Sequence, residues 1–308
     1  MRISPLCAVL VVALFGARPD SLRAQQSPAG ATADTLMAHA VTLRRLNRKA
    51  AALADMRRAL EISPGRVDLR RFRDQLQQEV HGLDVIPSVE VADNAQGPSQ
   101  EAQLSLRKNT ASGPFIVRGA SVRQFGVRDE KIDVEAYPAF RGGYLTLAGS
   151  RASSGRLYAQ SMLSALLFKS LPGQFEASAG YRRLNFSSPV SIATASIGNY
   201  FRDYQFGVRV NRMAGATHGL STSASARQYL TDDGQYIGLI ATVGSVRDQI
   251  RTAADLGDQS NKSVAAEAMF VLASRWIVSS RASIGLDELS RGPSAVASSL
   301  TLGFGVRF

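Results

Sequence analysis

Cysteine is almost absent from the sequence, and its single occurrence lies in a segment that is not expected in the mature protein. Residues 1–24 combine Arg2, an apolar run from Leu6 to Phe15 and small residues before Ala24-Gln25. This is the layout of a secretory signal peptide, and its apolar run is too short to span a bilayer. Because Cys7 lies inside it, the exported chain is expected to lack disulfides and thiolate metal sites.

Long apolar runs are also missing. Beyond the signal, no segment approaches the roughly 18 to 20 apolar residues that a transmembrane helix requires. A transmembrane β-strand needs only about 9 to 11 residues, of which every second one faces lipid, so averaged hydropathy does not detect it. The mean hydropathy of −0.05 is therefore compatible with a membrane barrel.

Histidine is scarce, which limits the chemistry available. The three histidines are His39, His81 and His218, and no two lie near each other in the sequence, so no histidine metal site is expected. Only His218 falls in the region of strand-like pattern. It differs in strand parity from Ser221, so the two would point to opposite faces, and no hydrolase is expected.

Two acidic clusters leave a choice between metal binding and turn formation. Asp232-Asp233-Gly234 and Asp255-Leu256-Gly257-Asp258 contain oxygen ligands suitable for calcium. Asp-Gly is also common in tight turns, and the turn interpretation is preferred. With no phosphate-binding glycine motif either, the sequence predicts no catalytic residue, no metal and no cofactor.

The charge is strongly positive, with 36 Lys+Arg against 25 Asp+Glu, a net +11. This balance suits an anionic partner such as lipopolysaccharide or an acidic polysaccharide, and for an exported protein nucleic acid is the least expected. The alternative is that the arginines are solvated charge spread over the molecule, since blocks of like charge are absent.

Residues 33–80 have a helical pattern. Apolar residues recur at spacings of three and four from Thr35 to Leu60, with a turn near 46–49 and a stop at Ser63-Pro64-Gly65, and Val67 to Val80 repeats the pattern. Small residues at 40, 52 and 59 and the proline at 64 fit a tetratricopeptide-like frame. The alternative is an ordinary helical hairpin. About one and a half repeats are too few to stand alone, so this module is expected to pack on the barrel mouth or on a periplasmic protein partner.

Residues 81–112 are predicted to be a periplasmic linker. The segment contains Pro87, Asp93-Asn94 and Gly97-Pro98-Ser99 and shows no sustained period.

From Gly113 to Phe308 the pattern changes to short alternating runs. In Tyr204 to Asn211, for example, aromatic and aliphatic residues alternate with Gln, Gly, Arg and Asn. Twelve such runs are expected, near 113–126, 129–140, 142–151, 155–171, 174–186, 189–201, 203–214, 217–231, 234–246, 263–274, 276–288 and 294–308. The spacing is typical of an antiparallel transmembrane β-barrel. Short turns near 141, 172, 202, 232 and 275 would lie on the periplasmic side of the membrane. The long connection at 247–262 would lie on the extracellular side.

The last run has the pattern of a closing barrel strand. Leu300, Leu302, Phe304, Val306 and Phe308 share one face, opposite Thr, Gly and Arg. We expect this strand to pair antiparallel with 276–288 and with the first strand near 113–126. Phe304, Val306 and Phe308 are the candidate signal for the barrel-assembly machinery.

The polar faces of the strands predict the residues of the lumen, because a charge facing lipid costs a few kcal/mol near the midplane. The candidates are Glu176, Arg182, Arg209, Arg227, Arg281 and Asp287. A surplus of arginine among them would favour anions. Alternatively, arginines paired with acids fill a narrow lumen. Aromatic residues near strand ends are expected to form interfacial girdles: Tyr200, Phe201, Tyr204, Tyr229, Tyr236 and Trp276.

Four phrases of the barrel region carry a family resemblance: Val134-Glu135-Ala136-Tyr137-Pro138, the segment Gly180 to Phe186, Ile197-Gly198-Asn199-Tyr200, and the segment Ala226 to Leu230. Their order and spacing, after a signal and a short helical region, resemble the YaiO family of outer-membrane proteins. The resemblance implies a barrel in the outer membrane of a Gram-negative-type bacterium, with a periplasmic helical extension and no catalytic residues to carry over. Here the helical region is abbreviated.

The expected architecture is therefore mainly β, with a transmembrane antiparallel barrel of about 12 strands preceded by the helical module. The expected role is a non-enzymatic channel, export or surface component, with anionic polysaccharide as a candidate cargo. A closed structural or adhesion barrel is the alternative, and a lipid-active outer-membrane enzyme is a third.

Overall fold

The chain forms two compact units, which divide between Val80 and His81 in the computed structural model. The structure describes residues 32–45, 49–94, 97–110, 112–140, 142–215, 218–230, 235–245, 259–273, 275–289 and 294–308. The expected signal at 1–24 and the two acidic clusters at 232–234 and 255–258 lie outside these ranges. In the described part of the chain, no helix is long and apolar enough to cross a membrane.

The first unit contains three helices, α2 (Ala33–Arg45), α3 (Lys49–Ile62) and α4 (Val67–His81). Their buried core is drawn from all three and includes Leu36, Leu43, Leu53, Met56, Leu69, Leu76 and Val80. Ala40, Ala52 and Ala59 have no exposed surface. Small side chains at these positions allow the helices to approach closely, as the sequence predicted, while the likeness to tetratricopeptide repeats stays a prediction.

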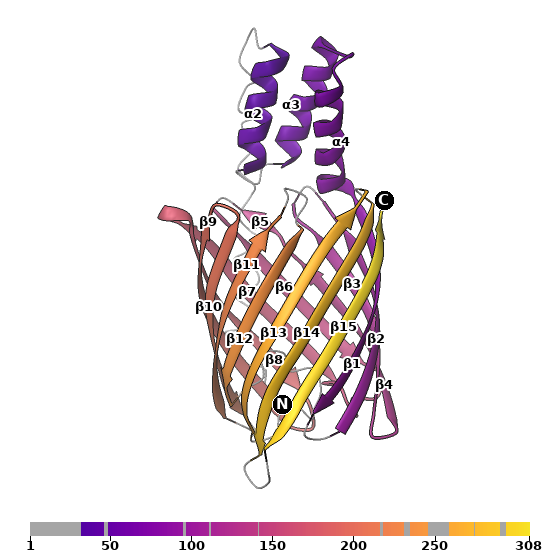
Figure 1. The fold of residues 1–308 in the computed structure, drawn as a ribbon, viewed down its shortest axis with the longest axis vertical. Helices are drawn as coiled ribbons and strands as arrows, with labels where there is room; N and C mark the ends of the chain where they lie inside the picture. The colour runs from indigo at the N-terminus through magenta and orange to yellow at the C-terminus, as the bar shows by residue number, and fades with distance from the viewer. Residues whose placement is uncertain are drawn as a thin grey trace, which may run out of the picture. The chain divides into compact units, whose positions relative to one another are not determined.

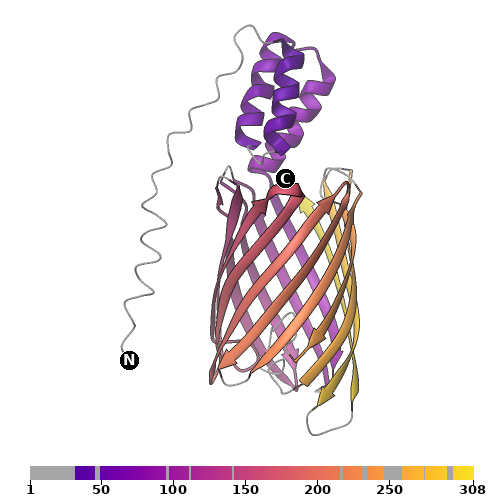
Figure 2. The same ribbon diagram turned by 90° about the vertical axis from the view of Figure 1, so that its left-hand side faces the viewer.

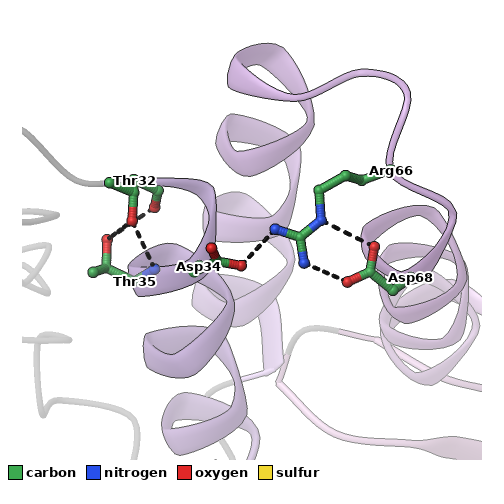
Figure 3. Close-up of polar contacts among 5 residues, drawn as sticks. All are labelled: Thr32, Asp34, Thr35, Arg66 and Asp68. Atoms are coloured by element: carbon green, nitrogen blue, oxygen red, sulfur yellow. Dashed lines mark hydrogen bonds and ion pairs between the residues drawn. The ribbon is translucent and has the colours of Figure 1, made fainter.

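Polar contacts join the ends of these helices (Figure 3). The Thr32 hydroxyl accepts a hydrogen bond from the Thr35 amide at 3.3 Å, which caps the N-terminus of α2. Arg66, just before α4, donates to Asp34 of α2 at 2.5 Å and to both carboxylate oxygens of Asp68, at 3.1 and 2.5 Å. The hydrogen bonds to Asp68, the larger cause, and to Asp34 raise the pKa of Arg66. The Arg66–Asp68 hydrogen bond also lowers the pKa of Asp68.

Two further contacts cross between helices. The His39 ring on α2 lies 2.6 Å from the Asp55 carboxylate on α3. Glu79 of α4 forms ion pairs with Arg44 of α2 at 2.6 Å and with Lys49 of α3 at 3.2 Å. These ion pairs link three helices that have only a small apolar core.

The second unit is a closed antiparallel β-barrel of fourteen long strands (Figures 1 and 2). The strands are β1 (Leu83–Asn94), β2 (Gly97–Lys108), β3 (Phe115–Gln124), β4 (Val127–Ala136), β6 (Gly143–Ala152), β7 (Ser161–Leu171), β8 (Phe175–Asn185), β9 (Pro189–Phe201), β10 (Tyr204–Gly215), β11 (Gly219–Tyr229), β12 (Tyr236–Gly244), β13 (Gln259–Leu272), β14 (Trp276–Leu289) and β15 (Ala295–Arg307). A two-residue strand, β5 (Ala139–Phe140), pairs with the start of β6.

The linker predicted at 81–112 is wrong, because this segment forms the first hairpin of the barrel. β1 and β2 pair along their whole length, from Leu83 opposite Lys108 to Asn94 opposite Gly97. Pro87 hides the strand in the sequence, since proline has no backbone N–H to donate to a ladder. The β1–β15 register accordingly skips Ile86 and Pro87. These two strands raise the predicted count from about 12 to 14.

The barrel closes between β1 and β15, which lie side by side in Figure 1. β15 pairs antiparallel with β14, as predicted. Its other partner is also antiparallel but is β1, and the predicted partner at 113–126 is the third strand. Gly305 makes the seam possible, because a Cβ there would lie 2.6 Å from the Val85 carbonyl oxygen.

The two ends of the barrel are distinguished by where β1 and β15 begin and end. The Phe308 end is where β1 begins and β15 ends; the far end is where β1 ends and β15 begins. Of the predicted short turns, those near 172, 202 and 275 join strands at the Phe308 end, and 141 and 232 lie outside the described residues. The connection predicted at 247–262 joins strands at the far end, although β13 already begins at Gln259.

The run predicted at 155–171 is only partly a strand. β7 starts at Ser161, and residues 153–160 form an inward-folded loop at the far end. Asp129, on the interior face of β4, accepts hydrogen bonds from the backbone amides of Ser154, Leu157 and Tyr158 at 3.0–3.1 Å. Tyr158 is 1% exposed. Satisfied backbone groups and a buried aromatic ring explain why apolar residues here do not continue the strand.

The inward-folded loop covers an apolar patch of the interior wall. Leu157 and Tyr158 pack on Ala120 and Val122 of β3. Ala159 packs on side chains from β8, β9 and β10, namely Leu184, Val190, Ile192 and Met213, together with Phe186. The interior of the far end is therefore partly filled by the chain itself.

The outer surface of the barrel carries an apolar band. Large exposed side chains alternate along the strands on the face opposite the interior, for example Val89, Leu104, Ile132, Leu163, Leu167, Ile197, Phe206, Val208, Leu239, Val264, Ile284, Leu300 and Leu302. A closed barrel with such a band hydrogen-bonds its backbone within the sheet and presents hydrocarbon to lipid.

Candidate functional site: the barrel interior

The interior face carries many charged residues, and among the described residues its acids and bases are similar in number. The described acids are Asp84, Glu90, Glu101, Asp129, Asp133, Glu135, Glu176, Glu267 and Asp287; the bases are Arg107, Arg118, Lys131, Arg182, Arg209, Arg227, Arg281 and Arg307. Alternation along each strand places them opposite the lipid-facing residues. Among the described residues, the interior therefore has no surplus of arginine, the feature that would favour anions.

An arginine–glutamate–arginine cluster spans β11, β13 and β14. Arg227 lies 2.6 Å from one Glu267 oxygen, and Arg281 lies 3.7 Å from the other. The Arg227 guanidinium also stands 4.9 Å from the centre of the Tyr236 ring. Gly238, between Arg227 and Glu267 in the register, leaves room for the pair to meet across β12.

A second cluster joins β3 and β4. The Arg118 guanidinium donates to both oxygens of Glu135, and the Tyr137 hydroxyl donates to the same carboxylate at 2.6 Å. Bidentate pairing of this kind fixes the geometry of both side chains. Arg182 of β8 also acts electrostatically on Glu135.

Aromatic residues line the interior at the Phe308 end from β4 to β12. The rings of Tyr144 and Phe168 stack with centroids 4.4 Å apart. Gln205 donates to the Tyr200 hydroxyl at 2.9 Å and accepts from the Tyr229 hydroxyl at 3.0 Å. We call Tyr137, Tyr144, Phe168, Tyr200, Tyr229 and Tyr236 the aromatic arc.

The aromatic arc corrects part of the predicted girdle. Tyr200, Tyr229 and Tyr236 lie on the interior face: Tyr200 is in register with Gln205, and Tyr229 is in register with Tyr236. Phe201, Tyr204 and Trp276 are exposed on the outer face at the Phe308 end, and Trp276 stacks on Phe304 at 5.4 Å. The sequence marks both groups as residues near strand ends, but only the register decides which face each occupies.

The predicted lumen residues all lie on the interior face, with different surroundings. Arg227 and Arg281 are brought together by Glu267. Asp287 is fully buried and accepts a hydrogen bond from Asn261 at 2.7 Å. Glu176 and Arg182 are half-buried, and Arg209 is exposed.

Several interior residues were not singled out from the sequence. Asp84 lies in the segment predicted as linker. Glu267 lies in a predicted strand, where its alternation with Ser263 and Ala265 marked the polar face. Arg118, Glu135 and Asp129 also lie on the polar positions of alternating runs. Their partners could not be read from the sequence, because they depend on how the strands pair in the sheet.

His218 and Ser221, the residues considered for catalysis, do not lie together. His218 is exposed just before β11, whereas Ser221 is buried on the interior face and accepts a hydrogen bond from Asn211 at 3.4 Å. Among the described residues, no group of three or more His, Cys, Asp or Glu side chains is arranged to hold a metal ion.

The closed sheet, the apolar outer band and the polar interior define an outer-membrane β-barrel protein. Residues 81–249 match the family model of the YaiO membrane beta barrel domain. The match covers more than half of the chain, and the protein therefore belongs to this family. The matched range begins at His81, just before β1, in agreement with a barrel whose first strand is β1.

Solved structures with a similar fold include other outer-membrane barrels. One is the outer membrane protein Omp33 of Acinetobacter baumannii, with 12% identity, coverage of 75% of this chain and 100% of that one, and a TM-score of 0.48. Another is a KdgM porin in complex with disordered oligogalacturonate, with 10% identity, coverage of 73% and 99%, and a TM-score of 0.43. A bacterial polysaccharide outer membrane secretin has 8% identity, coverage of 75% and 98%, and a TM-score of 0.48. No curated protein matches the sequence.

Proposed function

We propose that this protein is a conduit for saccharide chains across the outer membrane. The observation that carries the proposal is the partial exposure of polar side chains that face away from lipid. Gln103, Glu176, Arg182 and Gln205 are neither fully buried nor on the outer surface, and Arg209 is exposed. Their exposed area borders the interior, which supports a lumen holding water.

The aromatic arc supports saccharide as the cargo. Tyrosine offers an apolar ring for the C–H face of a sugar and a hydroxyl for its polar edge. At the Phe308 end, Tyr200 and Tyr229 are held by Gln205, with Arg227 and Glu267 close to Tyr236. Rings beside hydrogen-bonding groups suit a chain of sugars that slides from site to site.

The charge of the cargo is less constrained than the net charge of the protein suggests. Interior arginines meet acids in the Arg227–Glu267–Arg281 and Arg118–Glu135 clusters. Paired charges of both signs favour neither anions nor cations strongly. The proposal therefore includes neutral saccharides beside the anionic polysaccharide expected from the sequence.

The orientation is part of the proposal. α4 ends at His81 and β1 begins at Leu83, so the helical unit is attached to the Phe308 end of the barrel. We place this end in the periplasm, where the helices would offer a docking surface for a periplasmic protein. An even number of strands then puts both barrel termini on that side.

Planar-bilayer recording of the refolded mature protein tests the conduit. An ion current that neutral and anionic oligosaccharides reduce is expected. Tyr200→Ala and Tyr229→Ala should weaken this block, whereas Tyr204→Ala, which removes an outward tyrosine at the same end, should leave it unchanged. Absence of current, with or without residues 25–80, would contradict the proposal.

A second candidate is a closed structural or adhesion barrel. The inward-folded loop favours it, because residues 153–160 occupy the interior at the far end. Under this alternative, no current would appear even after the loop is shortened.

The remaining alternative is a lipid-active enzyme, which our proposal does not include. His218 lies just before β11 and apart from Ser221. Comparing lipid A and phospholipids in cells that produce wild type and His218→Ala tests it, and an altered lipid in the wild type alone would favour the enzyme.

A further inference from the structure

The far end of the barrel carries a row of cations on its outer, lipid-facing surface. Each lies within the last four residues of its strand at that end, and each is exposed: Arg123, Arg128, Arg151, Arg183, Arg212 and Lys262. We call this set the basic rim. It is distinct from the interior charges, which are balanced, and it accounts for part of the positive balance of the chain.

Two members of the basic rim stand in an arrangement that an anion would stabilise. Arg123 of β3 and Arg128 of β4 are directly opposite in the register. Like charges in this position destabilise a strand pair. Arg128 lies 2.8 Å from Glu130, and Asp93 is the other outward acid at the far end among the residues whose side chains the structure describes. The acids do not match the arginines in number.

The basic rim lies at the border of the apolar band. Arg183 is in register with Leu163, and Arg212 is in register with Leu220. These leucines are 69% and 55% exposed. A guanidinium beside an exposed leucine suits a molecule with a phosphate next to hydrocarbon, because arginine binds phosphate in a planar, bidentate manner.

A groove on the same surface has the shape for hydrocarbon. It measures about 400 Å³ and runs across β12 to β15. Its outward lining is Ala241, Val264, Ile284, Leu286 and Val296, with Lys262 among the lining residues. An apolar groove that includes a lysine from the basic rim combines the two features in one place.

We propose that the basic rim binds the phosphate groups of a phosphorylated, acylated lipid of the outer leaflet, with an acyl chain in the groove beside Lys262. The far end lies in the outer leaflet under the orientation proposed above. The chemistry that selects the ligand is phosphate for the arginines and hydrocarbon for the groove. Several such lipids would bind around the far end of the barrel.

The test compares two double variants of the full mature protein in detergent. Arg183→Gln/Arg212→Gln removes two rim cations, and Lys108→Gln/Lys169→Gln removes two outward cations at the Phe308 end. Native mass spectrometry measures binding of lipid A and of the same lipid A after removal of its phosphates. Heat-modifiable migration on a gel confirms that each variant is folded.

We expect wild type and the lysine variant to bind phosphorylated lipid A equally, and the arginine variant to bind it about thirtyfold more weakly, the effect expected for two surface cations. Equal binding of dephosphorylated lipid A would overturn the proposal. So would equal losses in both variants, or complete displacement of the lipid by millimolar inorganic phosphate, which would identify a site for free phosphate instead.

Discussion

Arg307 and Asp84 join the two ends of the barrel sequence. They are direct partners in the β1–β15 register, and the Arg307 Nε atom donates to Asp84 Oδ1 at 2.9 Å. The Asp84 side chain is 2% exposed and that of Arg307 19%. A buried pair is costly to break from one side, because the remaining charge has no partner.

Asp84→Ala and Arg307→Ala are therefore each expected to destabilise the barrel by about 3 kcal/mol or more. The exchange Asp84→Arg/Arg307→Asp should recover part of the loss, since it restores opposite charges across the seam. Urea unfolding in lipid vesicles measures both effects. A double exchange as unstable as the two single variants combined would show that the pair does not hold the seam.

Phe308 continues the seam with its backbone. Its amide donates to the Leu83 carbonyl at 2.8 Å, and the Leu83 amide donates back at 3.1 Å. We propose that the outward row Phe304, Val306 and Phe308 is also read by the barrel-assembly machinery. Deleting Phe308 should lower the amount of folded protein in the outer membrane more than Arg209→Ala does, measured by heat-modifiable migration. Normal assembly of the deletion would contradict this role.

Glu267 neutralises two arginines of the lumen, so its removal should alter ion selectivity. In Glu267→Gln, Arg227 and Arg281 keep their charge without the carboxylate. The ratio of anion to cation permeability is expected to rise by roughly two- to fivefold, the effect of one unit charge a few ångströms from an ion in water. The reversal potential across a salt gradient gives this ratio. Lys262→Gln, on the outer surface, is the control and should leave it unchanged.

Asp129 holds the inward-folded loop, so its replacement should open the far end. Hydrogen bonds to a charged acceptor contribute about 1.5–3 kcal/mol each, and Asp129 accepts them from three backbone amides of the loop. Asp129→Ala should raise the unit conductance and expose residues 153–160 to protease. Unchanged conductance together with a cleaved loop would show that the loop does not restrict the lumen.

The Arg66–Asp68 pair gives the helical unit a pH-dependent stability. Arg66 lowers the pKa of Asp68 below its ordinary value of 3.8. The pair therefore stabilises the folded unit above that value, and its contribution is lost as the pH falls through the lowered pKa. Asp68→Asn should lower the midpoint of helix melting at pH 7, with a difference that begins to shrink as the pH falls below about 3.8 and is lost only below the lowered pKa. Circular dichroism at 222 nm measures it, with Asp74→Asn as an exposed control.

The sequence alone determined the class of the protein, because period-two alternation is a property of each strand by itself. It placed Glu176, Arg182 and Arg281 on the interior face and Leu300, Leu302 and Phe304 on the outer face. It also predicted a run at each long strand from β3 onward, although the run for β7 began too early, at residue 155. The same alternation in β1 was interrupted by Pro87, so the first hairpin was missed. The pairing of β14 with β15 followed from their adjacency in the chain.

Tertiary structure decided which residues meet across strands. Closure brings Asp84 beside Arg307, and the register brings Glu267 between Arg227 and Arg281, although these residues are far apart in the sequence. It also decided that residues 153–160 turn inward, because Asp129 satisfies their amides and an apolar patch receives their side chains. Local pattern sets the face of a side chain, whereas its partners depend on register, which only the closed sheet establishes.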